Sequence, residues 1–376
     1  MKYWIPILLL FVAACKSEAD EASEPSEPIV EEQLSALNLP EGFSIHTYAD
    51  VDNARSMALS PSNILYVGNR SSDKVYAVKD TDGDYRADEI YVLDSGLTLP
   101  NGVAFRNGDL YVAEVNRILR YPDIENNLAS PPEPEVIYDQ FPTEKHHGWK
   151  YIAFGEDGKL YVPVGAPCNI CDPEEEIFAS ITRMNPDGTG LEIYAHGVRN
   201  SVGFDWDPAT GDFWFTDNGR DNLGDSLPPC EMNRVTAAGQ HFGYPYCHGG
   251  YISDPEFGEL ADCADFVAPQ VKFAAHTAPL GMKFYRGNMF PEDYQGDIIV
   301  AQHGSWNRSS KIGYRLVRVS VENGEAVDHS VFVDGWLNEA EQESWGRPVD
   351  VLEMPDGSLL VSDDQAGKIY RIVYEG

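Results

Sequence analysis

Short apolar segments separated by polar turns recur along this chain. Each unit consists of an apolar strand, a turn containing Asn, Asp or Gly, a second apolar strand, a polar loop and a third strand. Most of these segments are rich in β-branched and aromatic residues, and helical periodicity is nearly absent, so the pattern indicates antiparallel strands. Copies of the unit begin at Met57, Val103, Ile152, Val202, Met282 and Val349.

Repeats of this length, each forming a small antiparallel sheet, are typical of a β-propeller. The copies predict an all-β fold, a six-bladed β-propeller with four-stranded antiparallel blades. The early segment FSIHTY (43–48) is expected to complete the last blade and close the ring. A β-sandwich is the alternative, but it does not explain the repetition. The longer interval between the fourth and fifth copies, which contains residues 240–266, predicts an excursion that shapes a ligand site on one face.

A short polar segment precedes the first strand of each unit. If the first strand is innermost, these segments encircle one mouth of the central channel. Residues far apart in the sequence would then face each other there. Two arginines and a histidine suit an anion site with a base better than they suit a structural plug. The polar residues in these segments include Asn101, His147, Arg199, Asn200 and Arg347.

The stretch from His196 to Asn233 concentrates polar groups at both ends of one predicted hairpin. Arg199 and Asn200 stand just before its first strand, and the sequence DNGRD (217–221) follows its second. Adjacent strands place these two ends at the same sheet edge. A guanidinium, amides and an exposed turn suit an anion held beside a hard cation. The alternative is a turn network that only bonds to itself.

The net charge indicates which partners are excluded, and the N-terminal residues indicate where the protein is expected. The 376 residues include 27 Lys plus Arg and 61 Asp plus Glu, a net charge of -34, which argues against nucleic-acid binding. Residues 1–15 have a basic start, an apolar core and small residues before Cys15, so they are expected to be a signal peptide. The sequence VAAC resembles the lipobox of bacterial lipoproteins. This resemblance implies lipidation at Cys15 and a place in the bacterial cell envelope, periplasmic or surface-exposed; an ordinary secretory signal is the alternative.

Domain boundaries follow from composition. Residues 16–38 are rich in Glu, Ser, Ala and Pro and predict an acidic flexible tether, which would hold the propeller of residues 39–376 away from a membrane. The membrane contact would be made only through the lipid anchor. No other stretch approaches the roughly 18 apolar residues that a spanning helix needs.

Five cysteines follow the predicted lipobox. In an oxidising compartment, Cys168 and Cys171 are close enough to pair, as are Cys247 and Cys263. Cys230 is then left unpaired, unless the pairing is different. A zinc site competes for Cys168 and Cys171, but no second pair at metal spacing accompanies it. The sequence Cys-x-x-Cys-His does not occur, so no covalently attached haem is encoded.

Five motifs lie in register with the repeats. They are His146-His147 before the third unit, HGVRN before the fourth, DNGRDN after its second strand, GSWNR in the fifth and WGRPVD before the sixth. Together they resemble the soluble PQQ-dependent sugar dehydrogenase family, and most closely its glucose/sorbosone branch, from about Leu39 to Val373. The resemblance implies PQQ over the channel mouth beside Ca²⁺. It also implies oxidation of a sugar, aldehyde or related polyol outside the cytosol, with electrons leaving to an external quinone or cytochrome.

The resemblance assigns roles to individual residues. His147, which aligns better than His146, would take the proton of the substrate hydroxyl while hydride passes to the quinone, a task that suits imidazole. Arg199 and Asn200 match a pair that contacts the quinone, and Asn218 matches a further cofactor-contacting amide. Positive charge at Arg199 would stabilise the reduced cofactor.

The remaining assignments concern calcium and the far side of the cofactor. The backbone carbonyls of Gly219 and Arg220 match calcium ligands. Arg347 matches an arginine that pairs with a PQQ carboxylate. Arg308 is assigned the role of a cofactor-binding lysine. Its rivals for that role are His303 and Lys311.

The chain also departs from the glucose enzymes. These enzymes have an Asp that supports the catalytic histidine, at the position where this chain has Ala166 after Gly165. The resemblance therefore leaves the support of His147 missing or supplied from elsewhere. A calcium-dependent lactonase would be a different function for a six-bladed propeller, but it predicts carboxylates around a channel metal. A non-enzymatic propeller that binds a partner or glycan would give His147 and Arg347 no shared task.

A second metal site is predicted independently of the resemblance. The sequence DTDGDYRADE places Asp80, Asp82, Asp84 and Asp88 at alternating positions around a glycine turn, with the Arg86 carbonyl available. Such oxygens can surround one calcium ion, although the EF-hand pattern is not met. A solvated acidic turn is the alternative. Calcium here would be structural.

Overall fold

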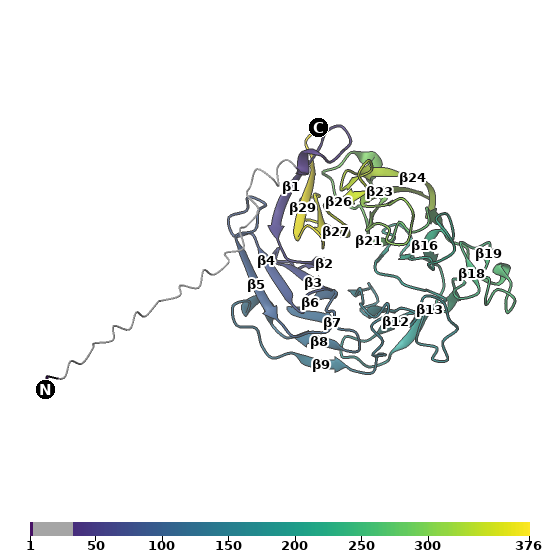
Figure 1. The fold of residues 1–376 in the computed structure, drawn as a ribbon, viewed down its shortest axis with the longest axis horizontal. Coiled ribbons are helices and arrows are strands. Elements are labelled where there is room, and N and C mark those ends of the chain that lie inside the picture. The colour runs from purple at the N-terminus through teal and green to yellow at the C-terminus, as the bar shows by residue number, and fades with distance from the viewer. Residues whose placement is uncertain (3–32) are drawn as a thin grey trace.

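Six β-sheets surround a central channel in the computed structural model, which describes residues 1–2 and 33–376 (Figure 1). The first strand of each repeat is innermost. Neighbouring inner strands contact each other around the ring, as with β2 (Ala54–Leu59) against β6 (Gly102–Arg106) and β27 (Pro348–Glu353). The prediction of a six-bladed all-β propeller is confirmed.

Each blade runs from the channel to the rim in chain order. The first blade is completed by β3 (Leu65–Asn69), β4 (Val75–Lys79) and β5 (Glu89–Asp94). The second is completed by β7 (Asp109–Ala113), β8 (Ile118–Tyr121) and β9 (Glu135–Tyr138). The third contains β10 (Ala153–Phe154), β11 (Leu160–Val164), β12 (Ser180–Met184) and β13 (Glu192–His196). The fourth contains β14 (Phe204–Trp206), β15 (Phe213–Asp217), β16 (Cys230–Val235) and β20 (Val271–Phe273). The fifth contains β21 (Pro279–Phe284), β22 (Ile298–Gln302), β23 (Arg315–Glu322) and β24 (Glu325–Val333).

The sixth blade is built from both ends of the propeller sequence. After β27, the strands β28 (Leu359–Asp363) and β29 (Lys368–Tyr374) continue outward, and β1 (Phe43–Asp50) pairs antiparallel with β29. Ile45 lies opposite Ile372 in this register. The expected closing strand is therefore confirmed.

The hydrophobic core is divided among the blade interfaces. Six buried clusters each join side chains of two adjacent blades, for example Met57 and Val67 of the first blade with Leu352 and Leu360 of the sixth. Strands that are buried on both faces therefore need apolar residues at successive positions, as in LYVGN and IIVAQ. Close packing also constrains the channel, where a Cβ at Gly281 would lie 2.5 Å from Asp350 Cα.

Additional elements lie outside the regular blades. The third blade has a fifth strand, β17 (Gln240–His241), which pairs parallel with β13. The expected excursion follows it and contains the hairpin of β18 (Cys247–His248) and β19 (Ile252–Ser253) and the short helix η2 (Cys263–Asp265). Another hairpin joins β25 (Leu337–Asn338) and β26 (Glu343–Ser344). The remaining short helices are η1 (Ile124–Asn126) and η3 (Glu292–Tyr294).

The cysteines pair as expected from their spacing. Disulfides join Cys168 to Cys171 and Cys247 to Cys263, and Cys230 is a buried free thiol. The Cys247–Cys263 bond links the small hairpin to η2 and so holds the two ends of the excursion together.

The residues just before β1 pack against the propeller. Leu37 is buried in the cluster between the fifth and sixth blades, and Asn38 forms a β-bridge with Asp334. These residues belong to the segment expected as a tether. The expected signal peptide with Cys15, and the tether up to residue 32, lie outside the described residues. No helix in the described part of the chain has the length and apolar character needed to cross a membrane.

Candidate active site

Two sets of residues line one mouth of the channel. One set consists of the entry segments before the inner strands, as predicted. The other consists of the residue directly after the second strand of each blade. Antiparallel pairing brings the two sets together, since Pro348 pairs with Asp363 and Pro279 with Gln302 at the same strand ends. The second set is Arg70, Glu114, Gly165, Asn218, His303 and Asp364.

His147 is held in an unusual backbone conformation. Its φ is 49°, in the left-handed region that non-glycine residues rarely adopt and that clusters at functional sites. The side chain is buried. A Cβ at Gly165 would lie 2.5 Å from the Cβ of His147, so glycine at that position leaves room for the imidazole.

The hydrogen bond of His147 determines its tautomer. Nδ1 lies 2.9 Å from the carbonyl oxygen of Ala166. Because a carbonyl only accepts, Nδ1 must carry the proton, and the neutral ring keeps its lone pair on Nε2. Burial lowers the pKa of His147 well below its ordinary value, and the charges of Arg199 and His146 lower it further. The ring is therefore neutral at pH 7 and able to accept a proton.

Ala166 supplies the support that the sequence comparison left open. Its carbonyl orients His147, and its N–H donates to the carbonyl of Arg199 at 2.8 Å. The two backbone polar groups of Ala166 thus link the base of the third blade to the arginine of the fourth. Sequence reasoning missed this role because a backbone acceptor requires no particular side chain.

Arg199 is buried and is anchored mainly by the disulfide loop. Its Nε donates to the Asn169 carbonyl at 2.9 Å, and its Nη2 donates to Asn169 Oδ1 at 2.8 Å. Nη1 donates to the Asn218 carbonyl at 3.0 Å. Asn169 lies between Cys168 and Cys171, so the disulfide loop positions the guanidinium.

Asp217 fixes the backbone of the fourth entry segment. Its carboxylate accepts from Arg199 N at 2.8 Å and from Asn200 N at 2.6 Å. Burial raises the pKa of Asp217 to about 6, while these N–H bonds favour its charged form. Asn218 Nδ2 donates to the backbone carbonyl of Asn200 at 2.9 Å, so the side-chain amide of Asn218 lies against the backbone of Asn200.

Gly219 and Arg220 continue the same loop. Arg220 turns its side chain away to Asp254 in the excursion, with Nη1 2.6 Å from Oδ2. Within the described part of the chain, neither the Gly219 nor the Arg220 carbonyl accepts a hydrogen bond. A small cavity of about 10 Å³ adjoins the loop and is lined in part by Gly219, Asp217 and Glu231. Oxygen atoms available at this place have the chemistry that a calcium site needs.

The fifth and sixth blades contribute Arg347, His303 and Asp364. Arg347 donates from Nε to the His303 carbonyl and from Nη2 to the Gly304 carbonyl, each at 3.0 Å. His303 Nε2 lies 2.8 Å from Asp364 Oδ1. The Arg55 guanidinium binds the other oxygen of Asp364 at 2.6 Å.

Arg308 and Lys311 have different surroundings. Arg308 donates from Nη1 to the Asp225 carbonyl at 2.6 Å and thereby ties the fifth blade to a loop of the fourth. The Lys311 side chain is exposed. His303, the other rival, already contacts Asp364 within the mouth. The assignment of Arg308 to cofactor binding therefore has less geometric support than that of Arg347.

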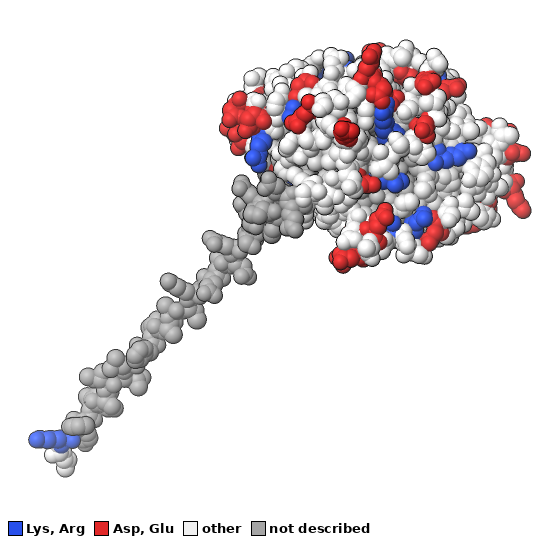
Figure 2. Space-filling model, turned by 90° about the horizontal axis from the view of Figure 1, so that it is seen from above, with Lys and Arg blue, Asp and Glu red and all other residues white. Residues whose placement is uncertain are grey.

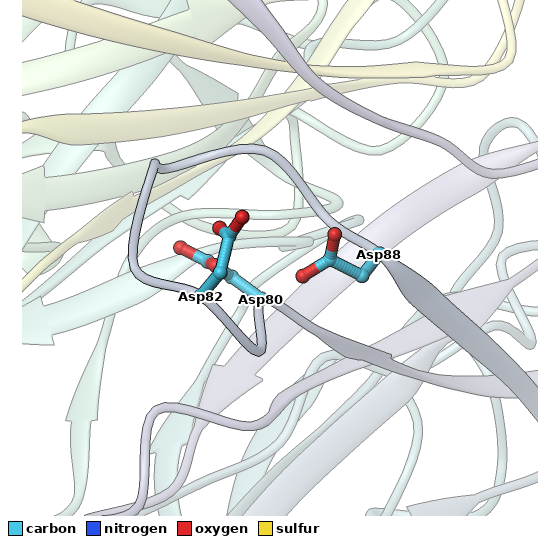
Figure 3. A group of neighbouring side chains, drawn as sticks. All are labelled: Asp80, Asp82 and Asp88. Atoms are coloured by element: carbon cyan, nitrogen blue, oxygen red, sulfur yellow. The ribbon is translucent and has the colours of Figure 1, made fainter.

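The predicted outer calcium loop connects β4 and β5 (Figure 3). Carboxylate oxygens of Asp80, Asp82 and Asp88 lie within 4.8 Å of one another, and Asp84 is outside this group. Some of these oxygens accept bonds from the loop itself. Asp80 accepts from Gly83 N at 2.7 Å, and Asp88 accepts from Thr81. Calcium binding by this loop stays a prediction.

The Asn169 contacts predict a measurable loss of order in the Ala variant. Asn169→Ala removes the acceptor of Arg199 Nη2 and of Asp221 N, and also the donor to Asp221 O. We expect amide exchange in residues 217–223 to become up to about tenfold faster, since these bonds hold that loop. Hydrogen–deuterium exchange mass spectrometry measures this change.

Asn185→Ala is the matched control. The Asn185 amide bonds to Thr189 on an exposed turn of the same blade. Exchange in residues 217–223 should stay at the wild-type rate in this variant. Equal exchange in the wild type and Asn169→Ala would contradict the clamping role of Asn169.

Comparisons with known proteins agree with this architecture. The model of the TrAA12-like family matches residues 37–375. An uncharacterised protein of Borreliella burgdorferi is 32% identical over 360 residues, which cover 92% of this chain and 93% of that protein. A pyrroloquinoline quinone-dependent pyranose dehydrogenase of Coprinopsis cinerea is 30% identical over 166 residues, 35% of this chain and 22% of that enzyme.

Solved structures share the fold at low sequence identity. The holo form of the pyranose dehydrogenase PQQ domain from Coprinopsis cinerea has a TM-score of 0.77 and 18% identity, covering 90% of this chain and 97% of that one. The PQQ-bound aldose sugar dehydrogenase from Streptomyces coelicolor has a TM-score of 0.63 and 19% identity, covering 89% and 99%. The chain therefore belongs to the TrAA12-like family, and its fold is that of the soluble PQQ-dependent sugar dehydrogenases, as the motifs around the channel mouth predicted.

Proposed function

We propose that this protein is a PQQ- and calcium-dependent oxidoreductase that oxidises a sugar, aldehyde or related polyol. The observation that carries the proposal is a neutral His147, with its Nε2 lone pair available, at a mouth lined by arginines. The pyranose dehydrogenase of Coprinopsis cinerea, which matches part of the chain, is PQQ-dependent by its name. The resemblance to the glucose/sorbosone branch includes sorbosone in this class of substrates.

The residues present fit an anionic quinone beside a hard cation. Arg199 and Arg347 come from the fourth and sixth blades and have guanidinium groups fixed by backbone carbonyls. Asn200 and Asn218 would add amide contacts. The carbonyls of Gly219 and Arg220, which have no hydrogen-bond donor in the described chain, would be calcium ligands.

The protein's own groups would move one proton and orient the substrate. When bound, PQQ supplies a two-electron acceptor for the hydride of an alcohol carbon. His147 Nε2 would take the hydroxyl proton, and the Ala166 carbonyl would stabilise the imidazolium through Nδ1–H. Arg199 stabilises negative charge that develops nearby. The charge of Arg199 also keeps His147 unprotonated before the reaction.

The lactonase alternative has less support. It requires several carboxylates around a metal in the channel. Among the described residues, the one group of three or more acidic, His or Cys side chains at metal-binding distances is on the outer loop at Asp80, Asp82 and Asp88. A propeller that only binds a glycan would have no use for the orientation of His147.

Location and electron transfer remain part of the proposal. The lipobox resemblance at Cys15 supports a lipid-anchored protein of the bacterial cell envelope, and the absence of a haem-attachment motif supports a separate quinone or cytochrome as electron acceptor.

Cofactor titration tests the proposed activity. Purified apoprotein with Ca²⁺ should bind one equivalent of PQQ, and added aldoses should reduce the quinone, as followed by absorbance. No binding at micromolar PQQ would eliminate the proposal. His147→Ala should lower kcat by at least about a hundredfold and largely spare PQQ binding, because the base is lost. His146→Ala should retain turnover; unchanged turnover in His147→Ala would refute its role as base.

The low pKa of His147 predicts the acid limit of activity. A general base is lost when it is protonated, so kcat/KM should fall only as the pH drops through the lowered pKa, below 6.5. His146→Ala removes one of the charges that lower this pKa and should move the acid limb to higher pH. A wild-type midpoint at or above pH 6.5, from a kcat/KM profile, would contradict the neutral buried histidine.

The outer loop predicts a second calcium ion. Asp88→Asn should remove one bound Ca²⁺ per chain from PQQ-free protein, measured by calorimetric titration, because it removes one charged ligand. Asp187→Asn is the control, since Asp187 also accepts from the N–H and hydroxyl of a threonine on an exposed turn. Equal stoichiometry in the wild type and Asp88→Asn would indicate a solvated acidic turn.

A further inference from the structure

Arg70 is a mouth residue that the sequence motifs did not identify. It directly follows β3, the position that Asn218, His303 and Asp364 occupy in other blades. Its guanidinium lies 3.8 Å from the ring centroid of Trp149. The Trp149 ring in turn meets the His147 ring edge-on, with centroids 6.0 Å apart. Arg70 and Trp149 are therefore a stacked pair beside the proposed base.

The other arginines of the mouth are bound by protein groups. Arg55 binds Asp364 and Asn101, Arg199 binds Asn169, and Arg347 binds two backbone carbonyls. In the part of the chain that the structure describes, the Arg70 guanidinium donates no hydrogen bond and has no acidic group within 4.0 Å. Its in-plane N–H groups are thus available to a ligand.

The surroundings of Arg70 favour an anion. Partial burial and the nearby positive charges of Arg55 and Arg347 lower the pKa of Arg70 to about 10, so it stays charged at neutral pH. The acidic group that opposes this effect, Asp364, is already bonded to Arg55 and His303. An unpaired charge among like charges is stabilised by a carboxylate, which a guanidinium binds with two parallel hydrogen bonds.

We propose that Arg70 binds a carboxylate group at the channel mouth and selects an acidic sugar, such as a uronic acid, as the substrate. This inference rests on the proposed sugar-oxidising function. The residues proposed to hold the quinone come from the fourth and sixth blades, whereas Arg70 belongs to the first and rests on Trp149 of the third. PQQ also carries carboxylates, so the same chemistry has a second source, which the experiment separates.

Titration of the apoprotein tests Arg70 without any turnover. D-Glucuronate should bind wild-type protein at least about tenfold more tightly than D-glucose, and Arg70→Gln should abolish that preference. Arg70→Lys should restore part of it, since the charge remains but the fork is lost. Arg106→Gln is the matched control. Arg106, on the inner strand β6, also lies over an aromatic ring, that of Phe154 on the inner strand β10. Like Arg70, it forms no ion pair in the described chain.

The same variants are then titrated with PQQ and assayed with both sugars. The expected result is a rise of about tenfold or more in KM for glucuronate in Arg70→Gln, with PQQ affinity and KM for glucose within about twofold of wild type. Weaker PQQ binding together with equal affinities for glucuronate and glucose would assign the carboxylate to the quinone and overturn the substrate inference. No change in either titration would overturn the carboxylate site altogether. If the wild type binds no PQQ, the proposed function fails, but the glucuronate titration still decides the role of Arg70.

Discussion

Backbone N–H groups of the entry segments bind to buried carboxylates, and the arrangement of the channel mouth depends on these bonds. Asp217 holds Arg199 and Asn200, and Asp363 holds Arg347 in the same way. Burial raises the pKa of both carboxyl groups to about 6, and the N–H donors offset part of that desolvation. In the fourth and sixth blades, the carboxylate ends the second strand of the same blade whose first strand follows the entry segment, so each of these two blades positions its own functional residues.

The repeats allowed the fold to be predicted from the sequence. They also predicted one of the two sets of residues that line the mouth, the entry segments. The order of the repeats alone predicted that His147, Arg199 and Arg347 belong to one mouth of the channel. The roles of Ala166 and Arg70 were not predicted, for different reasons. Ala166 acts through its carbonyl, and Arg70 is recognised only when β3 is known to end one residue before it. Arg308 was assigned through a motif, but its contacts depend on a loop of the neighbouring blade that local sequence does not specify.

Charge is distributed unevenly between the exterior and the mouth. The chain has a net charge of -34, and Figure 2 shows many acidic side chains spread over one face of the molecule. At the mouth the balance is different, because four arginines, at positions 55, 70, 199 and 347, lie there with only the acidic Glu114 and Asp364 among the residues that follow the second strands. An anionic ligand is therefore repelled at long range and attracted at short range, and added salt weakens the first effect more than the second.

The joining of β1 to β29 places the beginning and end of the propeller sequence in the blade that carries Arg347 and Asp364. Synthesis delivers β1 first and its partner last. The blade that carries Arg347 and Asp364 is therefore complete only when both ends of the propeller sequence are paired, so a change that weakens the β1–β29 pairing disturbs the channel mouth as well as the closure of the ring.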